Sequence, residues 1–136
     1  MELLRWKARL SVLWVFMAVG MSAFMFLYFM MPGTIEEVMA GKMEGMQLSE
    51  GMMVGYALYW LIPLIMAVLS LTLSGSANRW LNFVLGIIFA IWFILGIFEH
   101  SVVSEESVAI LIMYIAAIVV GALIAWFAWK LPKQEA

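Results

Sequence analysis

Methionine and histidine are the residues of this chain whose side chains could bind a soft metal such as Cu(I). The chain has 13 methionines, and Met39, Met43 and Met46 lie at four- and three-residue spacings that place them on one face of a helix. Thioether sulfurs are soft ligands for Cu(I), and His100 could add an imidazole. Methionine is also a flexible apolar filler, so packing alone accounts for the same spacing. The sequence leaves both interpretations open, a Cu(I) site and plain packing.

Large aromatic residues form a second candidate set, because each of four apolar segments contributes at least one at a similar depth. Pockets between bundle helices that are lined by aromatic side chains with few polar groups are ordinary ligand sites. A proline among these residues can kink its helix and open the bundle there. The alternative is an aromatic belt with ordinary core packing. The predicted ligand-binding residues are Tyr28, Tyr56, Tyr59, Trp60, Pro63, Trp92 and Tyr114.

The apolar segments contain no Asp, Glu, Lys, Arg or His. Proton-coupled transporters need ionisable residues at membrane depth, and small four-helix drug exporters depend on a glutamate in their first helix, which is missing here. The chain also has no cysteine, which excludes disulfides and thiol catalysis. The acidic residues outside the segments are not visibly paired with a base. We therefore expect a protein that is not an enzyme and that has no cofactor.

Four apolar stretches must position these residues: 10–31, 52–74, 80–98 and 107–129. Each has about the 20 residues that a helix needs to cross the hydrocarbon core of a membrane. The chain is 67% hydrophobic and 12% charged, with a mean hydropathy of +1.08. Backbone groups in lipid must bond internally, and short connections make neighbouring helices antiparallel. The sequence predicts an all-α fold, an antiparallel four-helix transmembrane bundle in which residues 1–136 form a single transmembrane domain.

The first connection between segments predicts a short amphipathic helix of its own. Pro32 and Gly33 end the first segment. Thr34 and Glu37 then match a capping box, in which each side chain bonds the backbone N–H of the other residue. Apolar residues recur on one face as far as about Met46. We expect this helix to lie on the outer membrane surface.

Two further local patterns predict how the helices are joined and packed. The second connection is a tight hairpin in which Ser76 or Asn78 is expected to cap the next helix. In the last segment, Ala117, Gly121 and Ala125 recur every four residues, which permits close approach of another helix.

The distribution of charged residues predicts how the helices are oriented in the membrane. Short loops rich in Lys and Arg stay in the cytoplasm. Lys42 is the only Lys or Arg in the connections on the other side. Both termini and the second connection are therefore expected in the cytoplasm, with the first and third connections outside. The cytoplasmic positive charges are Arg5, Lys7, Arg9, Arg79, Lys130 and Lys133, and the outer acidic residues are Glu36, Glu37, Glu44, Glu50, Glu99, Glu105 and Glu106.

Motifs along nearly the whole chain resemble a family of small bacterial four-helix membrane proteins that is catalogued only as a domain of unknown function. They are Leu13-Trp14-Val15-Phe16, the stretch 32–37, Asn78-Arg79-Trp80-Leu81-Asn82, and the closing stretch 125–132. The resemblance implies a bacterial cytoplasmic membrane. Members of that family tend to have acidic residues within helices one, two and four, whereas this chain has none there.

These observations favour a non-enzymatic integral membrane protein that binds an apolar ligand, a lipid or a partner's transmembrane helix in an outer-leaflet aromatic groove. The alternative is a small transporter or channel component for a soft metal such as Cu(I). The expected partners are membrane lipids, a second copy of the chain or another membrane protein, and no nucleic acid.

The orientation gives the first testable prediction. Cysteines introduced at Glu44 and at Gln134 should differ in their reaction with an impermeant thiol reagent on intact cells. Only the cysteine at position 44 should be labelled, because the positive charges hold the other one inside. Labelling at position 134 would contradict the orientation.

Overall fold

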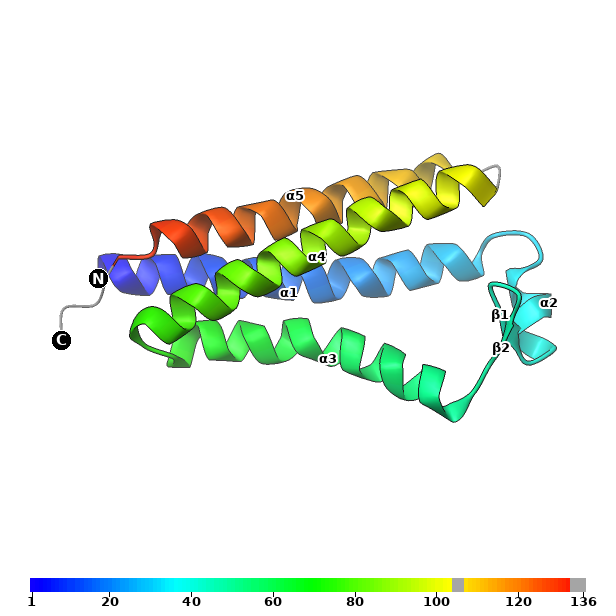
Figure 1. Cartoon of the computed structure of the whole chain (residues 1–136), viewed down its shortest axis with the longest axis horizontal. Coiled ribbons are helices and arrows are strands. Elements are labelled where there is room, and N and C mark those ends of the chain that lie inside the picture. Colours follow the sequence, from blue (N-terminus) through cyan, green and yellow to red (C-terminus); the bar gives the residue numbers. More distant parts are fainter. Residues whose placement is uncertain (104–106, 133–136) are drawn as a thin grey trace.

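Four long helices form the body of the protein in a computed structural model, which describes residues 1–103 and 107–132 (Figure 1). They are α1 (Glu2–Phe29), α3 (Glu50–Thr72), α4 (Gly75–Val103) and α5 (Val108–Lys130). Each is long and apolar enough to cross a membrane. Most of their large apolar side chains face outward, as lipid contact requires. The predicted all-α class with four membrane-capable helices is confirmed.

The charged residues divide the bundle into two ends. The start of α1, the link between α3 and α4, and the end of α5 lie together at one end (Figure 1). This end bears Arg5, Arg79 and Lys130 and is called the basic end below. The opposite end holds the connection between α1 and α3, with Glu44 and Glu50, and is called the acidic end. Successive long helices therefore run in opposite directions.

The closest helix contact joins α4 and α5 through glycine. A Cβ atom added to Gly86 of α4 would lie 2.8 Å from the backbone nitrogen of Ala125. One added to Gly121 of α5 would lie 3.0 Å from the backbone nitrogen of Ala90. Larger residues at either glycine would force the helices apart. The close contact predicted at Gly121 and Ala125 is confirmed, and Gly86 with Ala90 is the matching pair that the sequence alone did not identify.

A buried polar network joins α1, α3 and α4 in the half of the bundle nearer the basic end. Trp14 Nε1 donates to Asn82 Oδ1 at 2.7 Å across 68 residues of sequence. The Ser70 hydroxyl lies 2.9 Å from that same oxygen and 2.7 Å from the carbonyl oxygen of Met66, either of which accepts its single proton. The side chains of Trp14, Ser70 and Asn82 are fully buried.

Asn78 extends the network to the end of α3. The Nδ2 group of Asn82 donates to both the carbonyl and the side-chain oxygen of Asn78, at 2.8 and 2.7 Å. The Nδ2 group of Asn78 donates in turn to the carbonyl oxygens of Ser70 and Leu73, each at 3.0 Å. Ser70 belongs to the last turn of α3 and Leu73 is its C-cap residue, where carbonyl groups lack intrahelical donors. The expectation that Asn78 caps the start of its own helix is wrong, because its side chain caps the preceding helix instead.

The helix in the first connection is shorter than predicted. Helix α2 covers only Thr34–Met39, and an antiparallel pair of strands, β1 (Lys42–Met43) and β2 (Met46–Gln47), follows it. The two residues of the hairpin turn, Glu44 and Gly45, both have positive φ angles, 51° and 75°. Positive φ at both turn residues is the geometry that joins strands in a tight hairpin. The prediction of a helix that reaches about Met46 is therefore wrong, because the two strands and their hairpin turn occupy the residues after Met39.

The predicted capping box is also absent. Gly33, with φ 86°, is the N-cap residue of α2, and Thr34 is the first residue of the helix rather than its cap. Glu37 Oε1 instead accepts a hydrogen bond from the backbone N–H of Gly45. The carboxylate thus ties α2 to the hairpin turn rather than to the start of its own helix.

The network gives a second prediction. Replacing Asn82 by leucine removes the acceptor of Trp14 Nε1, and a buried group left without its partner costs about 1–3 kcal/mol. N82L should lower the thermal unfolding midpoint measured in detergent. Thr72→Val is the matched control, because the exposed Thr72 hydroxyl bonds only carbonyls of its own helix. Equal midpoints for the two variants would contradict a structural role for the network.

Candidate functional site

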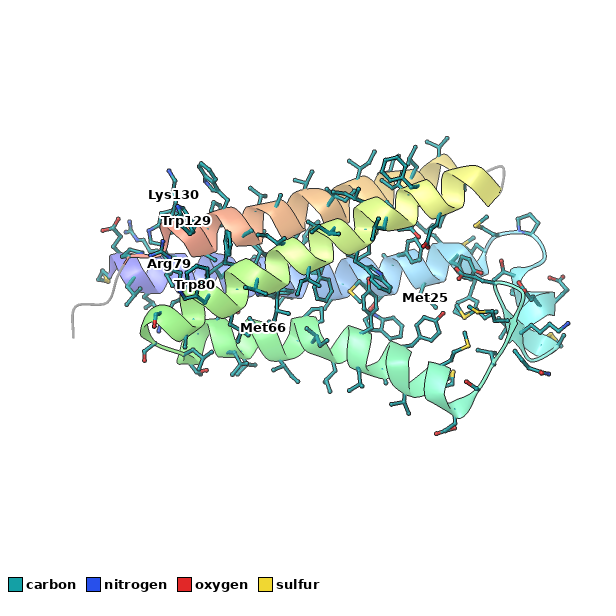
Figure 2. The ribbon with its side chains drawn as sticks, viewed as in Figure 1. Met25, Met66, Arg79, Trp80, Trp129 and Lys130 are labelled. Atoms are coloured by element: carbon teal, nitrogen blue, oxygen red, sulfur yellow. The ribbon has the colours of Figure 1, made fainter. Side chains whose placement is uncertain are left out.

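A cavity of about 670 Å³ lies among the four long helices, in the half of the bundle nearer the acidic end. All four helices contribute to its wall, and the hairpin adds Glu44 and Met46. In Figure 2, Met25, which lines the cavity, lies toward the acidic end, whereas Met66 lies on the other side of the middle of the bundle. The cavity and the buried polar network thus occupy different halves of the molecule.

Most of the predicted aromatic residues meet at this cavity. Tyr28 does not line it and stacks on Phe24 at a centroid distance of 6.4 Å. Pro63 is buried within α3 and is not part of the wall either. The five predicted residues that line the cavity are Tyr56, Tyr59, Trp60, Trp92 and Tyr114.

A chain of ring contacts links the four helices around the cavity. Tyr59 of α3 lies 6.4 Å from Phe93 of α4, which lies 6.1 Å from Tyr114 of α5. Tyr114 meets Phe24 of α1 edge to face at 5.2 Å. The sequence did not single out Phe24 and Phe93, because a phenylalanine inside an apolar segment gives no local signal of its orientation.

The cavity exists because α3 diverges from α4. Although these helices are consecutive, their backbones come close at few positions and side chains such as Tyr59 bridge the gap, while the backbone of α3 packs mainly on α1. Figure 1 shows α3 changing direction near its middle, and Pro63 lies within the helix. Proline removes a backbone donor and its ring displaces the preceding turn, which is a common cause of such bends. Gly20 and Gly55 widen the cavity further, since a Cβ atom at either position would meet nothing within 4 Å.

Methionines from several elements contribute sulfur atoms to the cavity wall. Three cavity methionines follow one face of α1, and the others come from β2, α3 and α5. Along this face of α1, a methionine recurs every four residues. The cavity methionines are Met17, Met21, Met25, Met46, Met52 and Met113.

The three methionines of the predicted metal site do not share a helical face. Met39 ends α2 and is 83% exposed, while Met43 is 6% exposed and pairs with Met46 in the hairpin. The predicted face is wrong because the helix stops before it. The side chain of His100 lies outside the described part of the chain. Within the described residues, no group of three His, Cys, Asp or Glu side chains could hold a metal ion.

The cavity wall has few charged or polar groups. Glu44, in the hairpin turn, and Glu99, near the end of α4, are the charged residues that line it, and both are exposed. Trp60 lines the cavity, but its Nε1 atom is buried away from the open space and has no hydrogen-bond partner among the described residues. The wall therefore offers an apolar aromatic and thioether surface, with carboxylates toward the acidic end.

The whole chain matches one family model. Residues 1–136 fit the model described as "Family of unknown function (DUF6326)". The chain belongs to DUF6326. No curated protein and no solved structure matches it. Membership of DUF6326 confirms the resemblance to a small four-helix membrane family of unknown function, and the use of the cavity must be argued from its geometry.

Proposed function

We propose that this DUF6326 member is a non-enzymatic integral membrane protein that holds an apolar molecule in the cavity near its acidic end. The basic end lies in the cytoplasm, so that the cavity lies in the outer leaflet, and the membrane is the bacterial cytoplasmic membrane. The distribution of Lys and Arg supports this orientation. The resemblance described above supports the choice of membrane.

The observation behind this proposal is the volume of the cavity. Ligand sites in proteins typically enclose about 300–1,000 Å³ and are mostly apolar, with a few placed polar groups. At about 670 Å³, this cavity falls in the middle of that range. A bundle stabilised only by packing would close over such a space, because voids lose dispersion contacts.

The same volume favours a small molecule over a partner's helix. A helix with its side chains is 10–12 Å wide and rises 5.4 Å per turn, so one turn fills on the order of 400–600 Å³. The cavity thus has room for little more than one helical turn. An apolar chain or ring system can use the space fully, and methionine side chains adapt to its shape at low cost.

The lining residues indicate the class of the ligand. Aromatic and methionine side chains form more than half of the wall, and its charged residues, Glu44 and Glu99, are carboxylates. Carboxylates repel an anionic group. The ligand class is therefore a largely apolar molecule without negative charge, such as a long-chain alcohol or ester.

A photoreactive long-chain alcohol that bears a diazirine tests this function in reconstituted membranes. Gly55→Phe would fill the cavity, because Gly55 lines it and faces open space. We expect saturable labelling of the cavity helices in the parent protein and a loss of at least fivefold in G55F. The readout is the mass-spectrometric yield of labelled peptides, with unlabelled alcohol as competitor.

Gly51→Phe is the matched control, since Gly51 lies one turn away on the same helix and does not line the cavity. It should retain the labelling of the parent. Labelling that cannot be competed, or that is equal in G55F and G51F, would overturn the proposal.

Transport of a soft metal is the second candidate, and the sulfur lining is the observation that favours it. Thioethers bind Cu(I), and Met21 and Met25 lie one turn apart on the cavity wall. Under the leading proposal, purified protein should retain no Cu(I) above background after dialysis. Stoichiometric Cu(I) that is lost in the double variant Met21→Leu/Met25→Leu would instead favour metal transport, because leucine preserves the apolar volume but removes sulfur.

A further inference from the structure

Among the described residues, three cations lie over tryptophan rings at the basic end, and two of these rings belong to α5. The guanidinium carbon of Arg79 lies 4.7 Å from the ring centroid of Trp129, and Lys130 Nζ lies 4.7 Å from that of Trp126. The third pair, Arg9 over Trp6, belongs to α1. These distances are typical of cation–π contacts. Figure 2 shows Arg79, Trp129 and Lys130 gathered at the same end of the α4–α5 pair. The two α5 rings are three residues apart on one helix, so each of the two cations lies over one of two neighbouring rings.

Arg79 has hydrogen-bonding capacity left over. Its Nε atom is buried and has no hydrogen-bond partner among the described residues. A guanidinium presents its donors as a planar fork, and phosphate oxygens match that geometry. The contact with the Trp129 ring uses the face of the guanidinium. Because Nε is buried, the terminal Nη groups are the donors of Arg79 that an outside acceptor can reach.

An apolar groove begins at the same two tryptophans. It has a volume of about 510 Å³ and lies between α4 and α5. Phe83 and Ile91 mark its extent on α4, while Ala122, Trp126 and Trp129 line it on α5. Phe83 and Ile91 are eight positions apart, which is a rise of about 12 Å along the helix and most of one leaflet of a hydrocarbon core about 30 Å thick. The groove shares no lining residue with the cavity near the acidic end.

We propose that this groove is a binding site for one anionic phospholipid of the leaflet at the basic end. One acyl chain lies along the groove, and the phosphate accepts hydrogen bonds from Arg79 and Lys130. Charge selects the lipid: two cations beside an apolar groove complement a headgroup with net negative charge better than a zwitterionic one. The small side chain of Ala122 leaves the middle of the groove open for the chain. This site is independent of the ligand cavity.

Native mass spectrometry of the protein in detergent tests the site, with phosphatidylglycerol and phosphatidylcholine of identical acyl chains as probes. We expect the parent to prefer phosphatidylglycerol. The double variant Arg79→Gln/Lys130→Gln should reduce that preference about tenfold or more, because it removes both cations that attract the anionic headgroup. Arg5→Gln/Arg9→Gln removes the same charge from the start of α1, outside the groove, and should retain the preference.

A second pair of variants tests the acyl chain. Ala122→Phe fills the groove from an exposed position, whereas Ala57→Phe adds the same bulk to an exposed position of α3 that lines neither cavity. Only A122F should weaken phosphatidylglycerol binding, and excess inorganic phosphate should not displace the lipid. The proposal is overturned if both double variants lose the preference equally, if A122F binds as the parent does, or if inorganic phosphate displaces the lipid. A dimer that A122F abolishes would also overturn it, because a second copy would then occupy the groove.

Discussion

The hydrogen bonds among Trp14, Ser70, Asn78 and Asn82 are the constraint on which the arrangement of this bundle depends. Lipid offers no water to satisfy an exposed indole N–H or amide, so these groups must find partners inside the protein. In the observed arrangement of α1, α3 and α4, Trp14 and Ser70 both lie within bonding distance of Asn82. Apolar packing between helices in a membrane is weakly directional, whereas this network fixes both the register and the rotation of three helices.

The network also explains why the two halves of the bundle differ. It holds the last turns of α3 against α4 at the basic end, and the Gly86–Gly121 contact holds α5 against α4. Nearer the acidic end, Tyr59 joins α3 to α4 through a ring contact with Phe93 and a side-chain hydrogen bond with Trp92. Pro63 lies between this contact and the part of α3 that the network holds. Large aromatic side chains therefore bridge the gap between α3 and α4 in this half, and the cavity opens among them on the side away from the network.

The sequence was sufficient for features that depend on local composition. Four long apolar runs predict four helices, because hydropathy and length alone decide whether a helix can cross a membrane. It was insufficient where a single turn competes with a helix, as at Glu44 and Gly45, whose positive φ angles favour a hairpin over a longer α2. It was also insufficient for contacts between distant residues: Trp14 and Asn82 are 68 positions apart, and no local pattern relates them. Tyr56, Tyr59 and Trp60 were placed together correctly because helical spacing puts them on one face.

Three of the four motifs behind the resemblance to DUF6326 lie in the half of the bundle that contains the network, whereas the stretch 32–37 lies at the acidic end. Asn78 and Asn82 belong to the network, and Arg79 lies over Trp129 at the basic end. Phe16 is the one residue of these motifs on the cavity wall. The hydrogen bonds that fix the helices do not pass through the cavity, so its wall can change without breaking the network that holds the bundle together.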